Sequence, residues 1–95
     1  MMQIKIAGIK YDIILKSSEE MHGGIGLANF NTQEIWVNET FSSQTKTIAY
    51  WHETIHILSD SYNLKLNEEN VKYLTHALIA LLEDNPGIVE QFKGN

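Results

Sequence analysis

The residues most able to do chemistry lie in the stretch YWHETIHIL, residues 50–58, where His52 and His56 are four apart and Glu53 follows the first histidine. In an α-helix, residues four apart lie on one face about one turn from each other. Both imidazoles can therefore point at one ion, and zinc accepts histidine nitrogens within a set of four ligands. Glu53 lies to the side, where it can reach a water on the metal. The spacing predicts two zinc ligands and a general base; the alternative is a helix whose paired histidines lie at the edge of the core.

This arrangement predicts a definite reaction. Zinc lowers the pKa of its bound water toward 7. Glu53 takes the proton as the water attacks a peptide carbonyl, and passes it to the leaving amine. The motif therefore favours a zinc-dependent hydrolase with Glu53 as its catalytic residue.

A catalytic zinc site usually takes three protein ligands, so a third is required. One extension of the motif places a glycine three residues and a histidine six residues after His56. Those positions hold Ser59 and Tyr62, which excludes that version. The other version takes a glutamate from a following helix.

The segment NEENVKYL offers two glutamates for that role, Glu68 and Glu69. Glu68 shares a helical face with Val71 and Thr75, which is expected to point inward, so Glu68 is the preferred third ligand. Glu69 remains the first alternative and His76, further along, the second.

Hydrophobic periodicity indicates the elements that must hold these residues. Residues 3–15 alternate around Gly8, which predicts two strands and a turn, and residues 25–30 and 34–38 predict a hairpin. A helix is expected from about 42 to 62, with Ser42 or Thr40 as its N-cap and an apolar stripe of Ile48, Trp51, Ile55 and Leu58. A second is expected from about 67 to 84, capped by Asn67, with Val71, Leu74, Leu78, Leu81 and Leu82 facing inward. Trp36 and Trp51 are both expected in the core.

Strands followed by helices predict an α+β fold, a mixed sheet of three or four strands followed by an active-site helix and a glutamate helix. At 95 residues the chain is expected to form one domain spanning 1–95.

Composition excludes several classes of function. The net charge is −5 and the seven lysines are scattered, which argues against nucleic-acid binding. The absence of cysteine excludes disulfides, thiolate metal sites and a cysteine nucleophile. No signal peptide and no apolar run long enough to span a membrane are recognisable, so a cytoplasmic protein without membrane partners is expected.

The sequence HETIH followed twelve residues later by Glu68, in a helix that starts E-x-x-V, resembles the gluzincin metallopeptidases. The resemblance is strongest to the single-domain minigluzincins and to phage- and mobile-element-borne HExxH proteins of the ImmA/IrrE type. It implies a zincin-like fold, a Zn²⁺ ion held by His52, His56 and Glu68, and a peptide or protein substrate extended along the edge strand. Residues 25–30 are the better edge candidate, so Leu27, Ala28 and Asn29 are expected to offer backbone groups to the peptide.

The chain also departs from that family. Larger gluzincins have an aspartate four residues after the ligand glutamate, where Lys72 stands here. The oxyanion helper is not identifiable; Tyr62, Tyr73 and His76 are candidates. The alternative function is therefore a zinc-containing but inactive or latent binding or regulatory module of phage or mobile-element origin. A helical-core protein without metal is a third.

Overall fold

Alternating apolar and polar residues form four strands in the first part of the chain, and two long helices follow, so the α+β prediction is confirmed. The computed structural model describes residues 2–92. Its elements are β1 (Met2–Ile6), β2 (Ile9–Lys16), β3 (Gly26–Asn29), β4 (Glu34–Asn38), α1 (Ser43–Ser61), α2 (Glu68–Asp84) and α3 (Ile88–Phe92).

The four strands make one mixed sheet in the order β1-β2-β4-β3. β1 and β2 are antiparallel and joined at Ala7 and Gly8, which both have positive φ, as a two-residue hairpin turn requires. β2 and β4 are parallel, and β3 is antiparallel to β4. β3 is therefore an edge strand, as expected, and one of its sides is open.

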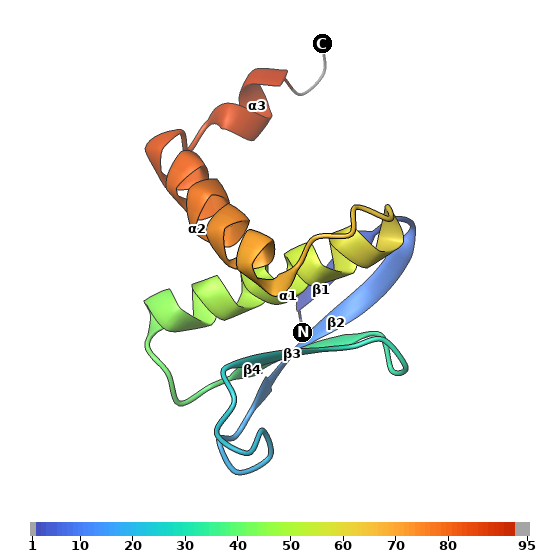
Figure 1. Cartoon of the computed structure of the whole chain (residues 1–95). Helices are drawn as coiled ribbons and strands as arrows, with labels where there is room; N and C mark the ends of the chain where they lie inside the picture. The colour runs from blue at the N-terminus through green and yellow to red at the C-terminus, as the bar shows by residue number, and fades with distance from the viewer. Residues whose placement is uncertain (1, 93–95) are drawn as a thin grey trace.

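The core lies between one face of the sheet and α1, which crosses that face (Figure 1). Its buried members are Ile6, Tyr11, Ile35, Val37, Ala49 and Ile57. The expected apolar stripe of α1 was only partly right: Ile55 is buried, but Ile48, Trp51 and Leu58 are half-buried. Ile57, which lies off that stripe, is completely buried. The buried face is wider and rotated because α1 packs against both the sheet and α2.

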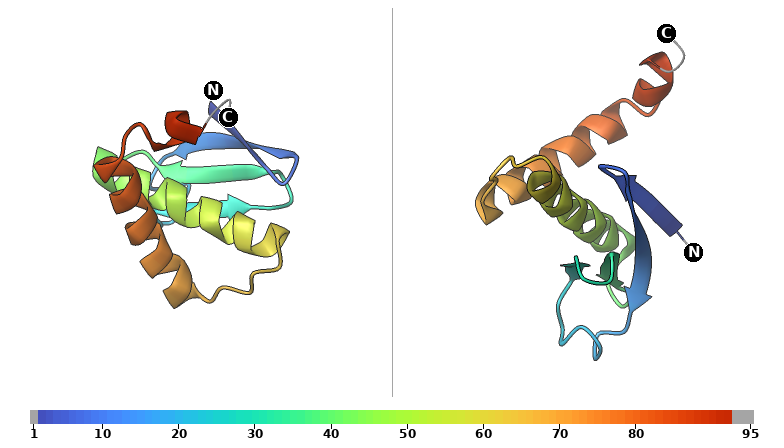
Figure 2. Two further views of the ribbon diagram at one scale, coloured as in Figure 1. Left: turned by 90° about the horizontal axis from the view of Figure 1, so that it is seen from above. Right: turned by 90° about the vertical axis from the view of Figure 1, so that its right-hand side faces the viewer.

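The predicted inward face of α2 was only partly right, and two of its members, Leu78 and Leu82, are half-buried. Val71 and Thr75 are completely buried, but Leu74 and Leu81 are 46% and 48% exposed. α2 packs mainly on α1 and then projects away from the sheet, carrying α3 at its far end (Figures 1 and 2). The contact with α1 therefore buries the side of α2 that carries Val71 and Thr75 and leaves Leu74 and Leu81 exposed.

Trp36 is also not a core residue. It is half-buried on the sheet face opposite α1, where the Lys16 ammonium lies 4.6 Å from its ring centroid. Its indole Nε1 donates to Glu34 Oε1 at 2.9 Å.

None of the helices within residues 2–92 combines the length and the hydropathy needed to cross a membrane.

Candidate metal centre

α1 holds His52 and His56 on the same side, as the spacing predicted. Ser42 caps the N-terminus of this helix, because its Oγ accepts a hydrogen bond from the Thr45 N–H. Thr54 and Ile55, between the two histidines, are buried, and this fixes the rotation of the helix. The two imidazole rings lie edge to face, 4.9 Å between centroids, with their Nε2 atoms 3.2 Å apart.

The loop after α1 places Glu68 opposite these rings. Buried Ser59, near the end of α1, accepts a hydrogen bond from the Leu66 N–H through its Oγ, which ties the loop back onto the helix. Asn67 then caps α2, accepting from the Asn70 N–H at 2.7 Å. Glu68 is consequently the first residue of α2, where the helix dipole also favours a carboxylate.

The three side chains converge. Glu68 Oε1 lies 2.6 Å from His52 Nε2, and Glu68 Oε2 lies 2.9 Å from His56 Nε2. Zinc bonds of about 2.0–2.1 Å at tetrahedral angles would place ligand atoms about 3.3 Å apart. The two imidazole nitrogens, 3.2 Å apart, are already close to that value, whereas the Glu68 oxygens, at 2.6 Å from His52 and 2.9 Å from His56, would have to move outward by about 0.7 Å and 0.4 Å. His52, His56 and Glu68 thus form a group that could hold a metal ion.

The alternatives for the third ligand do not join this group. Within residues 2–92, neither Glu69 nor His76 belongs to a set of side chains close enough to share an ion. Glu69 is exposed, and His76 lines a separate hollow between the start of α1 and the later turns of α2. Tyr62 and Tyr73 are 59% and 61% exposed, and neither is among the residues that line the two hollows beside His52 and His56. No oxyanion helper is therefore identified among these residues.

The side chain of Glu53, a residue of α1, lies against β3. Burial raises the pKa of its carboxyl above the usual value of 4.5; the charges of His52 and His56 and a hydrogen bond from the Ala28 backbone oppose this shift. A carboxylate with a raised pKa is a stronger base, as a group that must accept a proton from water needs to be.

Glu68 shows the opposite shift. Its slight desolvation works to raise its pKa, but hydrogen bonds and charge from His52 and His56 outweigh this and lower it. Its side chain is 71% exposed. The carboxylate therefore stays ionised over a wide pH range, which suits a metal ligand.

The register of β3 decides which of the three predicted residues, Leu27, Ala28 and Asn29, can offer backbone groups to a peptide. Ile25 O accepts from the Asn38 N–H, so in this antiparallel pair Leu27 and Asn29 also turn their backbone groups toward β4. Ala28 instead turns its N–H and C=O to the open edge, and Gly26 does the same. The Asn29 side chain is engaged in the turn after β3, where its Oδ1 accepts from two backbone N–H groups.

Gly26 is a site residue that the sequence did not single out. A Cβ at this position would lie 3.2 Å from both Ala49 Cβ and Glu53 Cγ. The absence of a side chain therefore allows β3 to approach Glu53 closely. A glycine inside a predicted strand often marks such an approach, and this was the available signal.

Comparison with known proteins adds no assignment: no family model, no curated protein and no solved structure matches the chain significantly. The chain is not assigned to a family, and the resemblance to gluzincins rests on the motif and on the placement of Glu68. What the structure supports is a possible His-His-Glu metal site that spans two helices.

Proposed function

We propose that this protein is a zinc-dependent metallopeptidase of gluzincin type, acting on a peptide or protein substrate. The observation that carries the proposal is the convergence of His52, His56 and Glu68, with Glu53 beside them against an open edge strand. Each part has a role in peptide hydrolysis: three ligands, one base and one strand to which a substrate can pair.

The donor set favours zinc. Two imidazoles and one carboxylate, with no thiolate available in the chain, match the three-ligand sites in which zinc keeps a fourth position open. The exposed Glu68 carboxylate leaves that side of the centre accessible to solvent and substrate. A structural zinc site would instead be closed by a fourth protein ligand, and within residues 2–92 the group contains three residues.

The chain's own residues divide the work. Zinc bound by this group would supply a Lewis acid that makes a water acidic and polarises a carbonyl. Glu53, with its raised pKa, accepts the proton of the attacking water and donates it to the leaving nitrogen. The outward-facing C=O of Ala28 and backbone of Gly26 align an extended peptide by strand addition.

Elemental analysis of the purified protein tests the first requirement, with one zinc per chain expected. The Glu53→Ala variant tests the second, since it should keep its zinc and lose all peptide cleavage measured by mass spectrometry. Glu69→Ala, an exposed glutamate outside the group, serves as the control and should cleave normally. A protein purified without zinc, or a Glu53→Ala variant that still cleaves, would contradict the proposal.

A second function is favoured by one observation. Outside its contact with α1, α2 presents the apolar side chains of Leu74 and Leu81 to solvent, which suits a module that acts by contact. In that case the metal would stabilise α2 against α1 and a peptide would not be cut. A binding activity that is unchanged by Glu53→Ala but lost on chelation would support this second function over the first.

A further inference from the structure

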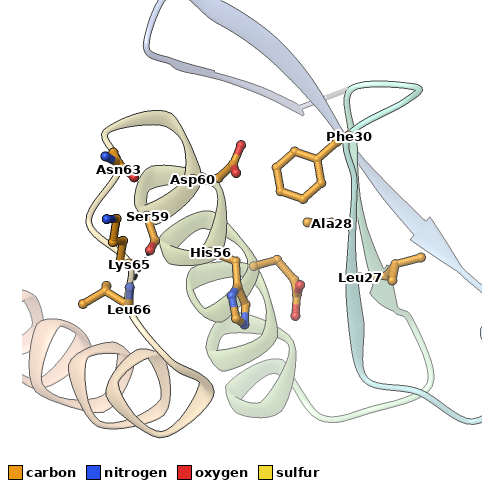
Figure 3. Close-up of a pocket in the computed structure, with 10 residues that line it drawn as sticks. Leu27, Ala28, Phe30, His56, Ser59, Asp60, Asn63, Lys65 and Leu66 are labelled. Carbon is orange, nitrogen blue, oxygen red and sulfur yellow. Dashed lines mark hydrogen bonds between the residues drawn. The ribbon is translucent and has the colours of Figure 1, made fainter.

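Two hollows flank the candidate metal centre and meet at Glu53. The larger, of about 440 Å³, lies on the His56 side and is drawn in Figure 3; the smaller, of about 360 Å³, lies on the His52 side. Glu53 lines both, and so does β3, through Ala28 in the larger and Gly26 in the smaller. A peptide paired with β3 and centred on Glu53 would therefore place residues from either side of its central bond in different hollows.

The hollow on the His52 side is largely apolar where it touches the core. Its lining residues are Ile25, Gly26, Ile48 and Ala49, together with Thr45, His52, Glu53 and Glu68. Apart from His52, Glu53 and Glu68, it is lined by no ionisable side chain. It has no feature that would favour a charged substrate residue.

The hollow on the His56 side has a different chemistry. Asp60 lies four residues after His56 on the same face of α1, and its carboxylate turns toward the Phe30 ring across the hollow (Figure 3). Within residues 2–92, the Asp60 side chain makes no hydrogen bond or ion pair. Phe30, just after β3, is 47% exposed although it is a large apolar residue.

A free carboxylate beside an aromatic face recognises a cation. A guanidinium can stack on the phenyl ring while its N–H groups pair with the carboxylate, and a lysine can make part of the same contact. Lys65 also lines this hollow, but it comes from the loop after α1 and lies across that helix from Phe30 in Figure 3. The ring and the carboxylate are therefore available together.

We propose that the hollow formed by Phe30 and Asp60 binds an arginine or lysine side chain of the substrate, next to the bond that is cut. This inference rests on the proposed peptidase function and specifies its substrate class: peptides with a basic residue on the His56 side of the scissile bond. The contact is exposed to solvent, so the preference is expected to be moderate.

Three peptides test the proposal. They are identical except for one residue beside the central bond, and this residue is arginine, leucine or glutamate. Binding is measured by fluorescence anisotropy on zinc-loaded Glu53→Gln protein, and cleavage is measured on the wild type. The arginine peptide should bind about fivefold to tenfold more tightly than the leucine peptide, as expected for an exposed ion pair supplemented by a cation–π contact. The glutamate peptide should bind least.

Matched variants separate a local contact from a general effect of charge. Asp60→Asn should remove the preference for arginine, and Asp60→Lys should transfer it to glutamate. Asp84→Asn makes the same change of charge at the end of α2, away from both hollows, and should keep the preference. Phe30→Leu should reduce the arginine preference without affecting the leucine peptide.

The outcomes distinguish this inference from the proposed function. Cleavage of all three peptides at equal rates would overturn the inference and leave the peptidase proposal standing. An arginine preference in binding that depends on Asp60, without cleavage of any peptide, would support the hollow's specificity and overturn the peptidase proposal. Equal effects of Asp60→Asn and Asp84→Asn would also overturn the inference.

Discussion

Replacement of Gly26 by alanine should displace Glu53 while leaving the metal ligands in place. Gly26 does not have a positive φ, so alanine is compatible with the backbone. The new Cβ would lie 3.2 Å from Glu53 Cγ and 3.4 Å from its Oε2, and 3.2 Å from Ala49 Cβ. Ala49 is buried in the core, whereas the Glu53 side chain can rotate, so Glu53 is the group that moves.

The size of the effect follows from these contacts. Carbon atoms in ordinary contact are about 3.5–4.0 Å apart, so Glu53 must shift by roughly half an ångström. Misplacement of a reacting group by 1 Å can cost about 100-fold in rate, so a loss of about tenfold in kcat is expected. The overpacking itself should cost about 1 kcal/mol of stability, which lowers the Tm of a domain of this size by about 4–8 °C.

The assay compares kcat and zinc affinity in the same variant. Zinc affinity, measured by competition with a chromophoric chelator, should stay within about twofold of the wild type, because the atoms nearest to a Cβ at this position belong to Glu53 and Ala49 and not to a ligand. Gly87→Ala is the control, since a Cβ there has no atom within 4 Å. An unchanged kcat in Gly26→Ala, or a parallel loss of zinc and activity, would refute the role given to Gly26. If the wild type cleaves nothing, a crystal structure of the variant still reports whether Glu53 has moved.

Three further changes test the centre. Burial raises the pKa of Glu53, so the folded apoprotein binds the Glu53 proton more tightly than the unfolded chain does. The stability that this proton provides is fully present below the ordinary pKa of a glutamate and is lost as the pH rises through the raised pKa of Glu53. Glu53→Gln should therefore raise the Tm of the chelated protein at pH 7 and have little effect near pH 4, and a pH-independent difference would contradict this cause. Glu68→Gln should weaken zinc binding by more than about 100-fold, since even the loss of a residue that only orients a ligand costs about 10–100-fold. Glu69→Gln should leave zinc binding unchanged, and equal effects of the two changes in calorimetric titrations would reject Glu68 as the third ligand. Val71→Ala should cost about 2 kcal/mol in chemical denaturation and also weaken zinc binding, because Val71 anchors the turn that carries Glu68; a loss of stability with unchanged zinc affinity would show that Glu68 is placed independently of it.

The local features of this protein could be predicted from the sequence because they depend on neighbours along the chain. Helical spacing put His52 and His56 on one face, and the choice of Asn67 as N-cap put Glu68 in the first turn of α2. The prediction that Val71 and Thr75 face inward on α2 was also correct. These conclusions need only the period of a helix and the chemistry of its first residues.

Other features depend on how separate elements pack. Leu74 and Leu81 have the same periodicity as a buried face, yet the side of α2 that α1 covers is the one that carries Val71 and Thr75, so both leucines stay about half exposed. The crossing of the helices, which no local pattern encodes, also decides that Glu68 reaches both imidazoles while Glu69 does not.

The sequence alone determined a pair of imidazoles with an adjacent carboxylate, the elements that carry them and the mixed α+β order of those elements. The tertiary structure decided which glutamate completes the group, that β3 lies against Glu53 through Gly26, and that Phe30 faces Asp60. The physical reason is that backbone geometry fixes side-chain directions within one helix or strand, whereas contacts between elements depend on packing summed over the whole core.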